Sequence, residues 1–96
     1  MKIHELKIDT AFFQATLEGR KKFEIRKDDR QFQAGDLLHL RETTFTGEQM
    51  KMDQPAKPLV YTGREISAVV TYILRGPIYG LDAGWVIMSI HANISQ

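Results

Sequence analysis

The sequence predicts a single α+β domain in which short, mostly antiparallel strands curl into a small β-barrel, with one main N-terminal helix packed on it. Its 96 residues are too few for several domains, since chains usually divide only well above this size. Runs with a period of two residues recur along the chain, and one stretch near the N-terminus has the period of a helix. The order is strand, helix, strand, strand, loop, strand, strand. Closing such strands into a barrel would remove their exposed edges.

The composition excludes several classes of protein. Apolar residues make up 43% and charged residues 26%, as in ordinary globular chains and unlike disordered or collagen-like ones. No apolar run approaches the roughly 18 residues that cross a bilayer, and the charged N-terminus lacks the pattern of a secretory signal. The absence of cysteine removes disulfides, thiol nucleophiles and cysteine-bound zinc. We therefore expect a cytoplasmic protein without a membrane partner.

The N-terminal third contains a strand followed by the clearest helix signal. Residues 2–7 alternate and predict a short first strand. Asp9 is a preferred N-cap type, because its carboxylate can accept the free amide hydrogens of a first helical turn. Phe13 begins an apolar face with helical spacing, and Gly19 stands where a left-handed residue would end the helix. We expect a helix over residues 10–18.

The next strand has an unusual charged face. Phe23 and Ile25 alternate with Lys22, Glu24 and Arg26, so one face is apolar and the other carries three charges in a row. Side chains two residues apart on a strand lie roughly 6.5–7 Å from one another. Such a row can hold a polar ligand through charged hydrogen bonds, or it can form an ion-pair ladder on a solvated face.

The middle of the chain is less regular. Residues 28–36 are polar and end in the turn signal Gly-Asp, and residues 37–42 resume a strand. Residues 43–58 contain one glycine, two prolines and no clear period. We read this segment as a mobile excursion within a long polar loop over residues 43–63.

The strongest strand signal lies at residues 65–74. Alternate residues line one apolar face, while Val69 and Ile73 place apolar groups on the other. Apolar residues on both faces predict a central strand that is covered on both sides. A tight loop over residues 75–80 and a last strand over residues 85–91 complete the domain.

Charge is unevenly distributed, although the net charge is only +1. Residues 20–30 carry six cations and three carboxylates, which is a local surplus of three positive charges. A basic stretch can attract phosphate or another anion, and it can equally be a solvated surface. Charge alone does not separate the two readings.

Several motifs together resemble one known family. The helix that ends in glycine and is followed by G-x-K-x-x-E-x-R, at residues 19–26, resembles the signature of ASCH domains. Residues 32–38 match the F-x-x-G-D-x-L that follows in such proteins, and residues 72–90 resemble their closing half. The similarity covers most of the chain except residues 43–63, and is strongest to an uncharacterised, small ASCH-like family of bacteria and phages. It implies a PUA-like barrel, a fold associated with RNA.

The first functional hypothesis is a domain that binds RNA or a nucleotide-like ligand. Its cleft would lie between the helix C-terminus, the charged strand and the loop over residues 76–80. Four cations would meet phosphates, Glu24 would accept hydrogen bonds from the amino group of a base, and Tyr79 would stack on that base. The cations are Lys21, Lys22, Arg26 and Arg30.

The second hypothesis is a hydrolase that acts on a modified nucleoside. ASCH-type acetylcytidine amidohydrolases use a lysine, a threonine and a glutamate, and the resemblance places Lys21 at the lysine and Glu65 at the later acid. The threonine position holds Glu24, which has no hydroxyl nucleophile but could act as a general base toward water.

A third hypothesis is a protein-interaction module that uses residues 43–58 as its contact surface. No cofactor is expected, and no metal site either, because His4, His39 and His91 lack ligand spacing and no carboxylate motif joins them. The sequence does not indicate an oligomeric state.

Overall fold

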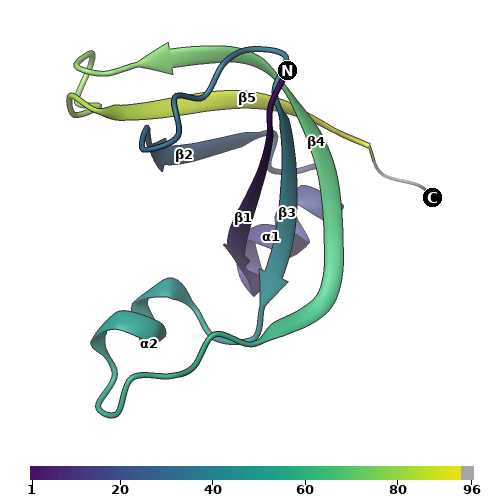
Figure 1. The fold of residues 1–96 in the computed structure, drawn as a ribbon, viewed down its shortest axis with the longest axis vertical. Helices are drawn as coiled ribbons and strands as arrows, with labels where there is room; N and C mark the ends of the chain where they lie inside the picture. The colour runs from purple at the N-terminus through teal and green to yellow at the C-terminus, as the bar shows by residue number, and fades with distance from the viewer. Residues whose placement is uncertain (94–96) are drawn as a thin grey trace.

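One curled sheet of five strands forms the body of the molecule (Figure 1). The computed structural model describes residues 1–93, and its elements in chain order are β1 (Ile3–Asp9), α1 (Thr10–Leu17), β2 (Phe23–Lys27), β3 (Leu37–Thr43), α2 (Gly47–Met52), β4 (Tyr61–Arg75) and β5 (Trp85–Asn93). Neither helix is long and apolar enough, within these residues, to cross a bilayer.

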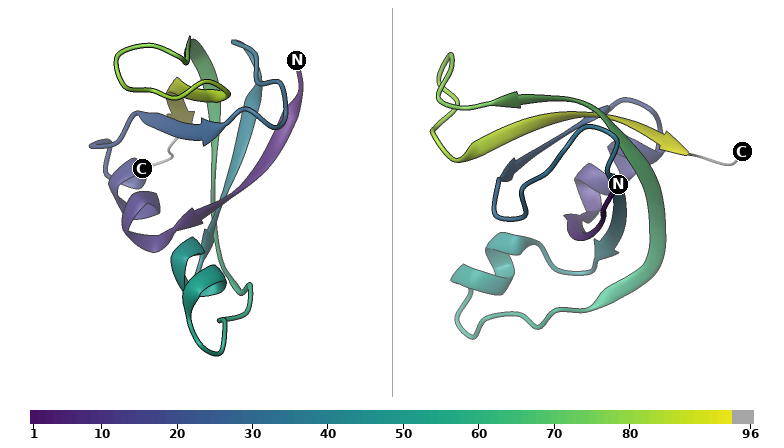
Figure 2. Two further views of the ribbon diagram at one scale, coloured as in Figure 1. Left: turned by 90° about the vertical axis from the view of Figure 1, so that its left-hand side faces the viewer. Right: turned by 45° about the horizontal axis from the view of Figure 1, so that its top comes forward.

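The sheet is mixed, and its curvature makes it a half-barrel (Figure 2). The strand order is β1-β3-β4-β5-β2, so β1 and β2 are the two end strands. β1 runs parallel to β3, because α1 carries the chain away before it returns, while the other three neighbouring pairs are antiparallel. The structure therefore confirms a small, barrel-like α+β domain, with a sheet that is left open between its ends.

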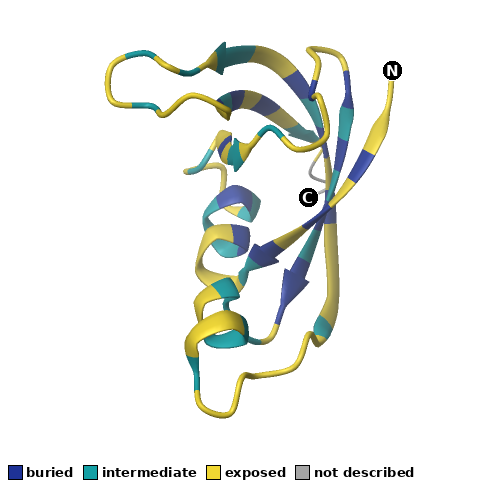
Figure 3. Cartoon of the chain, turned by 60° about the vertical axis from the view of Figure 1, so that its left-hand side comes forward, coloured by how far each residue is buried: buried dark blue, intermediate teal, exposed yellow. Residues whose placement is uncertain are grey.

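The core fills the concave side of the sheet. Buried residues alternate with less buried ones along β1, β3, β4 and β5 (Figure 3). Phe13 of α1, which is 1% exposed, packs with the buried side chains of these strands. Phe32, from the loop between β2 and β3, enters the same core. The buried apolar side chains are Leu6, Ile8, Phe13, Phe32, Leu38, Leu40, Ile66, Ala68, Val70, Val86, Met88 and Ile90.

The first helix agrees closely with its prediction, but the role expected for Asp9 is wrong. α1 begins at Thr10, and Asp9 occupies the N-cap position without a side-chain hydrogen bond to the helix. Its Oδ1 instead accepts a hydrogen bond from the backbone N–H of Gly47, at 3.0 Å. Asp9 therefore connects the end of β1 to the first residue of α2.

The expectation of an irregular excursion over residues 43–58 is also wrong, because α2 lies within it. Thr46 is the N-cap, its hydroxyl accepts from the N–H of Gln49, and the Gln49 side chain accepts from the N–H of Thr46. This reciprocal pair is a capping box, which satisfies two donors that a short helix would otherwise expose. The local hydrogen bonds explain how six residues without a buried side chain still form a turn of helix.

β4 is a central strand, as predicted, but its outer face is not covered by the described residues. It spans 15 residues and pairs with β3 through its first half and with β5 through its second half. A register shift between Val70 and Tyr72 marks a bulge, which bends the strand. Tyr72, just past the bulge, is 63% exposed.

Candidate functional site

A groove of about 780 Å³ lies where the sheet is open, between β1 and β2. β1 contributes its second half, β2 contributes all of its residues, and α2 forms a further wall through Met50 and Lys51. Phe12 of α1, Trp85 of β5 and the loop between β2 and β3 complete the lining. The segment over residues 43–58, expected to be a contact surface for a partner, thus supplies part of the wall of this groove.

The most enclosed polar group of the groove is Glu24, whose side chain is 5% exposed. Lys21 contacts one oxygen of its carboxylate, and the Nε of Arg26 lies 3.2 Å from the other. The two cations are more accessible, at 13% and 28%. A buried carboxylate needs such partners, because an unpaired charge in this position would be costly.

The alternation of β2 places Glu24 and Arg26 toward the concave side, together with the core. The apolar residues Phe23 and Ile25 remain 45% and 49% exposed. This is the reverse of an ordinary edge strand, whose apolar face would be expected inside. The inner face of β2 is polar because it borders the groove, where Lys21 and Arg26 compensate the carboxylate.

Lys21 also bonds to the free edge of β2. The N–H of Ile90 donates to the carbonyl of Lys22, so in an antiparallel ladder the backbone groups of Phe23, Ile25 and Lys27 point away from β5. Lys21 donates to the carbonyl of Phe23 at 2.6 Å. Lys21 thus satisfies one backbone carbonyl on the otherwise unpaired edge of β2.

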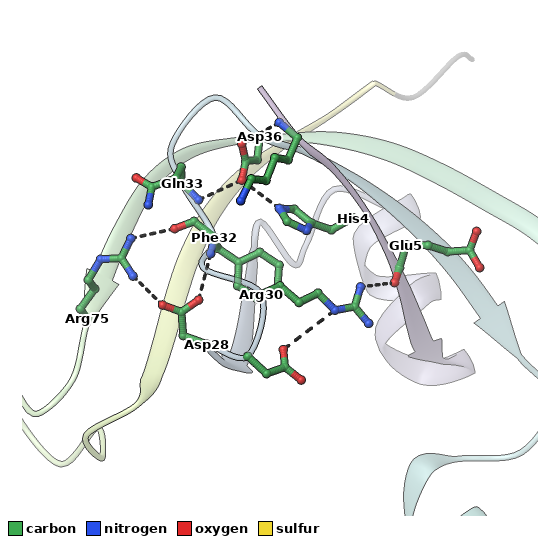
Figure 4. A network of polar contacts seen from close by, with 10 residues as sticks. His4, Glu5, Asp28, Arg30, Phe32, Gln33, Asp36 and Arg75 are labelled. Atoms are coloured by element: carbon green, nitrogen blue, oxygen red, sulfur yellow. Dashed lines mark hydrogen bonds and ion pairs between the residues drawn. The ribbon is translucent and has the colours of Figure 1, made fainter.

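Two arginines reach across the opening to β1. Arg26 donates from Nη2 to the carbonyl of Lys7 at 2.8 Å, and Arg30 donates to the carbonyl of Glu5. We call the line along which these contacts join β1 to β2 the seam. Figure 4 shows the Arg30 contact beside the loop that places this residue.

Aromatic rings and positive charge surround the buried carboxylate. The Nζ of Lys21 lies 4.9 Å from the ring centre of Phe23 and 6.0 Å from that of Phe12. Phe12 is 54% exposed. The residues that line the groove include six cations and three carboxylates, a surplus of three positive charges in a chain whose net charge is +1. The cations are Lys7, Lys21, Arg26, Lys27, Arg30 and Lys51.

The structure brings together four of the residues selected from the sequence and separates the other three. Lys21, Glu24, Arg26 and Arg30 all line the groove. Lys22 precedes β2, is exposed and does not line it.

Tyr79 and Glu65 lie elsewhere. Tyr79 is 98% exposed on the loop between β4 and β5, and no residue from 76 to 80 lines the groove. Glu65 belongs to the outer face of β4, since its neighbour Ile66 is buried, and it pairs there with His39. The expected cleft between the charged strand and the 76–80 loop is therefore replaced by one between β2, β1 and α2.

A second buried carboxylate, Asp36, organises the loop that carries Arg30. It accepts hydrogen bonds from His4 Nε2 at 2.9 Å and from the backbone N–H groups of Lys2 and Gln33 at 3.0 Å (Figure 4). Burial raises the pKa of Asp36, but these hydrogen bonds outweigh it and bring the pKa from 3.8 to about 2. The Gly-Asp turn recognised in the sequence thus ties the start of β1 to the loop.

The other end of this loop is held by Asp28. Its carboxylate accepts from the N–H of Phe32 and from Arg75 of β4, while Arg75 also donates to the carbonyl of Phe32 at 2.7 Å (Figure 4). These bonds place Phe32 in the core, edge-on to the ring of His4 at 4.7 Å. Both ends of the loop are therefore fixed, and with them the position of Arg30 on the seam.

A third network, which the sequence did not suggest, joins α1 to the sheet around Glu42. Arg64 donates to both carboxylate oxygens at 2.9 Å, and Thr62 donates to one at 2.6 Å. Arg64 lowers the pKa of Glu42 most, burial opposes it, and Thr62 adds to the lowering, so the pKa falls from 4.5 to about 2. Arg64 also bonds to Gln14 of α1 and stacks on Phe13, so this network is a structural tie.

Fold and groove together define a class: a small α+β half-barrel with a basic groove along its open side. Within residues 1–93 no three His, Asp or Glu side chains are grouped closely enough to hold a metal ion.

Comparison with known proteins then shows the family. The model of a domain of unknown function, DUF3850, matches residues 3–90, and the chain belongs to that family. The chain is also similar to the "Uncharacterized 12.9 kDa protein in GpA 3′region" of Escherichia phage P2, with 37% identity over 70 residues. That match covers 73% of this chain and 52% of the relative, so the chain spans about half the length of the protein it matches.

Proposed function

We propose that this domain binds RNA or a nucleotide-like ligand in the groove between β1 and β2, and that its half-barrel is of the ASCH, PUA-like type. The supporting observation is the combination of a surplus of three positive charges with the exposed rings of Phe12 and Phe23 beside Lys21. Cations that follow a backbone and aromatic rings that stack on bases are the two features that single-stranded nucleic acids require.

The assignment to the ASCH type rests on how its signature residues meet. Gly19 has a φ of 78°, a conformation that suits glycine, and turns the chain at the end of α1. Lys21, Glu24 and Arg26 of the G-x-K-x-x-E-x-R core then form one ion-pair cluster. A motif whose spaced members converge on a groove is better explained by a shared site than by chance.

Each group has a defined role in this proposal. Lys21 and Arg26 bind phosphate oxygens through those of their N–H groups that do not already bond to Glu24 or to a backbone carbonyl. Glu24 is a positioning residue, because both of its oxygens already face cations. Phe12 and Phe23, rather than the distant Tyr79, receive a base.

The test compares two lysines that carry the same charge but differ in place. Lys51 lies on α2 and lines the groove, while Lys22 is exposed outside it. Binding of a fluorescein-labelled, single-stranded RNA 12-mer of mixed sequence is followed by anisotropy over a series of salt concentrations. We expect Lys51→Ala to weaken binding several-fold and to reduce the salt slope by about 0.7, the value for one lost contact to a single strand. Lys22→Ala should leave both the affinity and the salt slope unchanged.

Identical affinities and slopes for the two variants would overturn the groove assignment. Absence of binding by the wild-type domain, to this RNA and to mononucleotides at millimolar concentration, would overturn the proposed function itself.

The contact between Lys21 and Glu24 also favours a second candidate, hydrolysis of an acylated nucleoside. Glu24 would act as the general base toward water, with Lys21 beside it, and Glu65 would take no part because it lies on the outer face. Incubation with N4-acetylcytidine, read by mass spectrometry, should release cytidine and acetate. Turnover no greater than that of Glu24→Gln would exclude this activity.

A further inference from the structure

The outer face of the sheet carries an apolar patch that lies outside the ion-pair cluster of Glu24 and borders the groove at Ile25 and Trp85. It crosses β2, β5 and β4, whose register places its members side by side: Leu74 is paired with Ile87, which is paired with Ile25, and Trp85 follows next to them. Tyr72 extends the patch along β4. We define the outer patch as Ile25, Tyr72, Leu74, Trp85 and Ile87.

The alternation of burial shows that these side chains face outward. In β5, Val86 and Met88 are 1% and 0% exposed, so they point to the core. Trp85 precedes Val86, and Ile87 lies between Val86 and Met88, so both point to the opposite face. In β4, the bulge after Val70 shifts the register, which places Tyr72 and Leu74 opposite Ser89 and Ile87 and leaves Ile73 against the core.

An outward-facing patch of this kind is unusual for an antiparallel sheet, whose open face is normally polar. Tyr72 is 63% exposed, Ile25 is 49% exposed and Trp85 is 38% exposed. The neighbouring outward positions along the same stretch add Phe23, Ser89 and a single charged residue, Lys27; of these, Phe23 and Lys27 also border the groove at the edge of β2. Contiguous exposed apolar surface on a small domain marks an interaction site.

We propose that the outer patch is the contact between two copies of this chain, packed face to face about a two-fold axis. The surface contains one charge, Lys27, and no carboxylate, so a basic partner finds nothing to pair with and an acidic partner finds a single lysine, whereas a second copy presents the same largely apolar surface. Two sheets of this kind pack with their strands nearly aligned.

The size of the patch sets the strength of the contact. Aromatic side chains present roughly 150–250 Å² when fully exposed, so the exposed fractions leave on the order of 400 Å² of apolar surface per copy. Together with a polar rim, two such surfaces approach the lower end of specific interfaces, about 1,200 Å² in total. The dimer should therefore be weak and reversible, with a dissociation constant in the micromolar range.

Sedimentation velocity over roughly 10–500 µM protein tests this proposal, with two matched tyrosine variants. Tyr72→Lys places a charge in the outer patch, outside the groove, and Tyr79→Lys places the same charge on the exposed loop tip. We expect the wild type and Tyr79→Lys to rise from 11.0 kDa toward twice that mass. Tyr72→Lys should associate at least tenfold more weakly while its circular dichroism spectrum is unchanged.

Three results would overturn the proposal. The first is a wild-type protein that stays monomeric at the highest concentration, and the second is a Tyr72→Lys variant that dimerises as the wild type does. The third is equal loss of association in both variants, because it would place the contact at the loop tip. RNA binding does not enter this measurement, so a failure here is distinct from a failure of the proposed function.

Discussion

Replacing Glu24 by glutamine tests whether the buried carboxylate organises the groove. The change keeps the shape of the side chain and removes its charge, so Lys21 and Arg26 lose their common partner. An amide oxygen can keep one of the two hydrogen bonds, while the new amide N–H group must face the other cation. The variant therefore separates the electrostatic role of the carboxylate from its packing.

The expected cost follows from the contacts of the three side chains. A hydrogen bond to a charged group contributes about 1.5–3 kcal/mol, and one such bond is lost. Lys21 and Arg26 remain partly solvated and keep their backbone acceptors, which are the carbonyls of Phe23 and Lys7. We expect the free energy of unfolding to fall by about 2 kcal/mol, which lowers the melting temperature of a domain of this size by roughly 8–16 °C.

Urea unfolding followed by circular dichroism measures this loss, with Asp29→Asn as the control. Asp29 also lines the groove, but its side chain is 68% exposed and its nearest cation, Arg30, lies 3.9 Å away. Each variant removes one negative charge from the groove. The control should change the free energy of unfolding by less than about 0.5 kcal/mol. Equal stability of Glu24→Gln and Asp29→Asn would refute the reasoning.

Two further predictions concern the frame around the groove. Asp36 and Glu42 have pKa values of about 2 in the fold, below their usual 3.8 and 4.5, so the stability they contribute is complete above about pH 4.5 and is lost as the pH falls toward 2. Urea midpoints measured from pH 7 to pH 2.5 should decline in this window, and a flat profile would contradict the two networks. Gly76→Ala should cost about 2 kcal/mol or more, because its Cβ would lie 2.0 Å from the carbonyl oxygen of Asp82. Gly47→Ala, where nothing lies within 4 Å, serves as the control and should melt within a few degrees of the wild type.

The strands and the first helix could be predicted because their signals are local. Alternation along residues 65–74 and the apolar face of α1 each require only neighbours in the sequence. α2 was missed although its signal is local as well, since Thr46 and Gln49 form a capping box that a search for Ser/Thr followed by Glu/Gln three residues later would have found.

The site was predicted in part, because its residue types were visible but its surroundings were not. The G-x-K-x-x-E-x-R motif selected Lys21, Glu24 and Arg26, which lie together. The position of β2 as an end strand depends on long-range pairing, and this pairing decides that its charged face lies inside and its apolar face outside. Burial of Glu24 and exclusion of Tyr79 from the groove follow from that topology, which alternation cannot reveal.

The seam has a consequence for how the molecule opens. Elsewhere in the sheet neighbouring strands are joined by backbone ladders, while β1 and β2 are joined by the guanidinium groups of Arg26 and Arg30. Separating the two ends therefore requires fewer broken bonds than separating any pair of neighbours. The half-barrel should therefore open locally along the seam first. The amide hydrogens of Lys7 and Ile25, on the free edges of β1 and β2, should exchange with deuterium before those in β4. A ligand that contacts both strand edges would hold them together and slow this exchange.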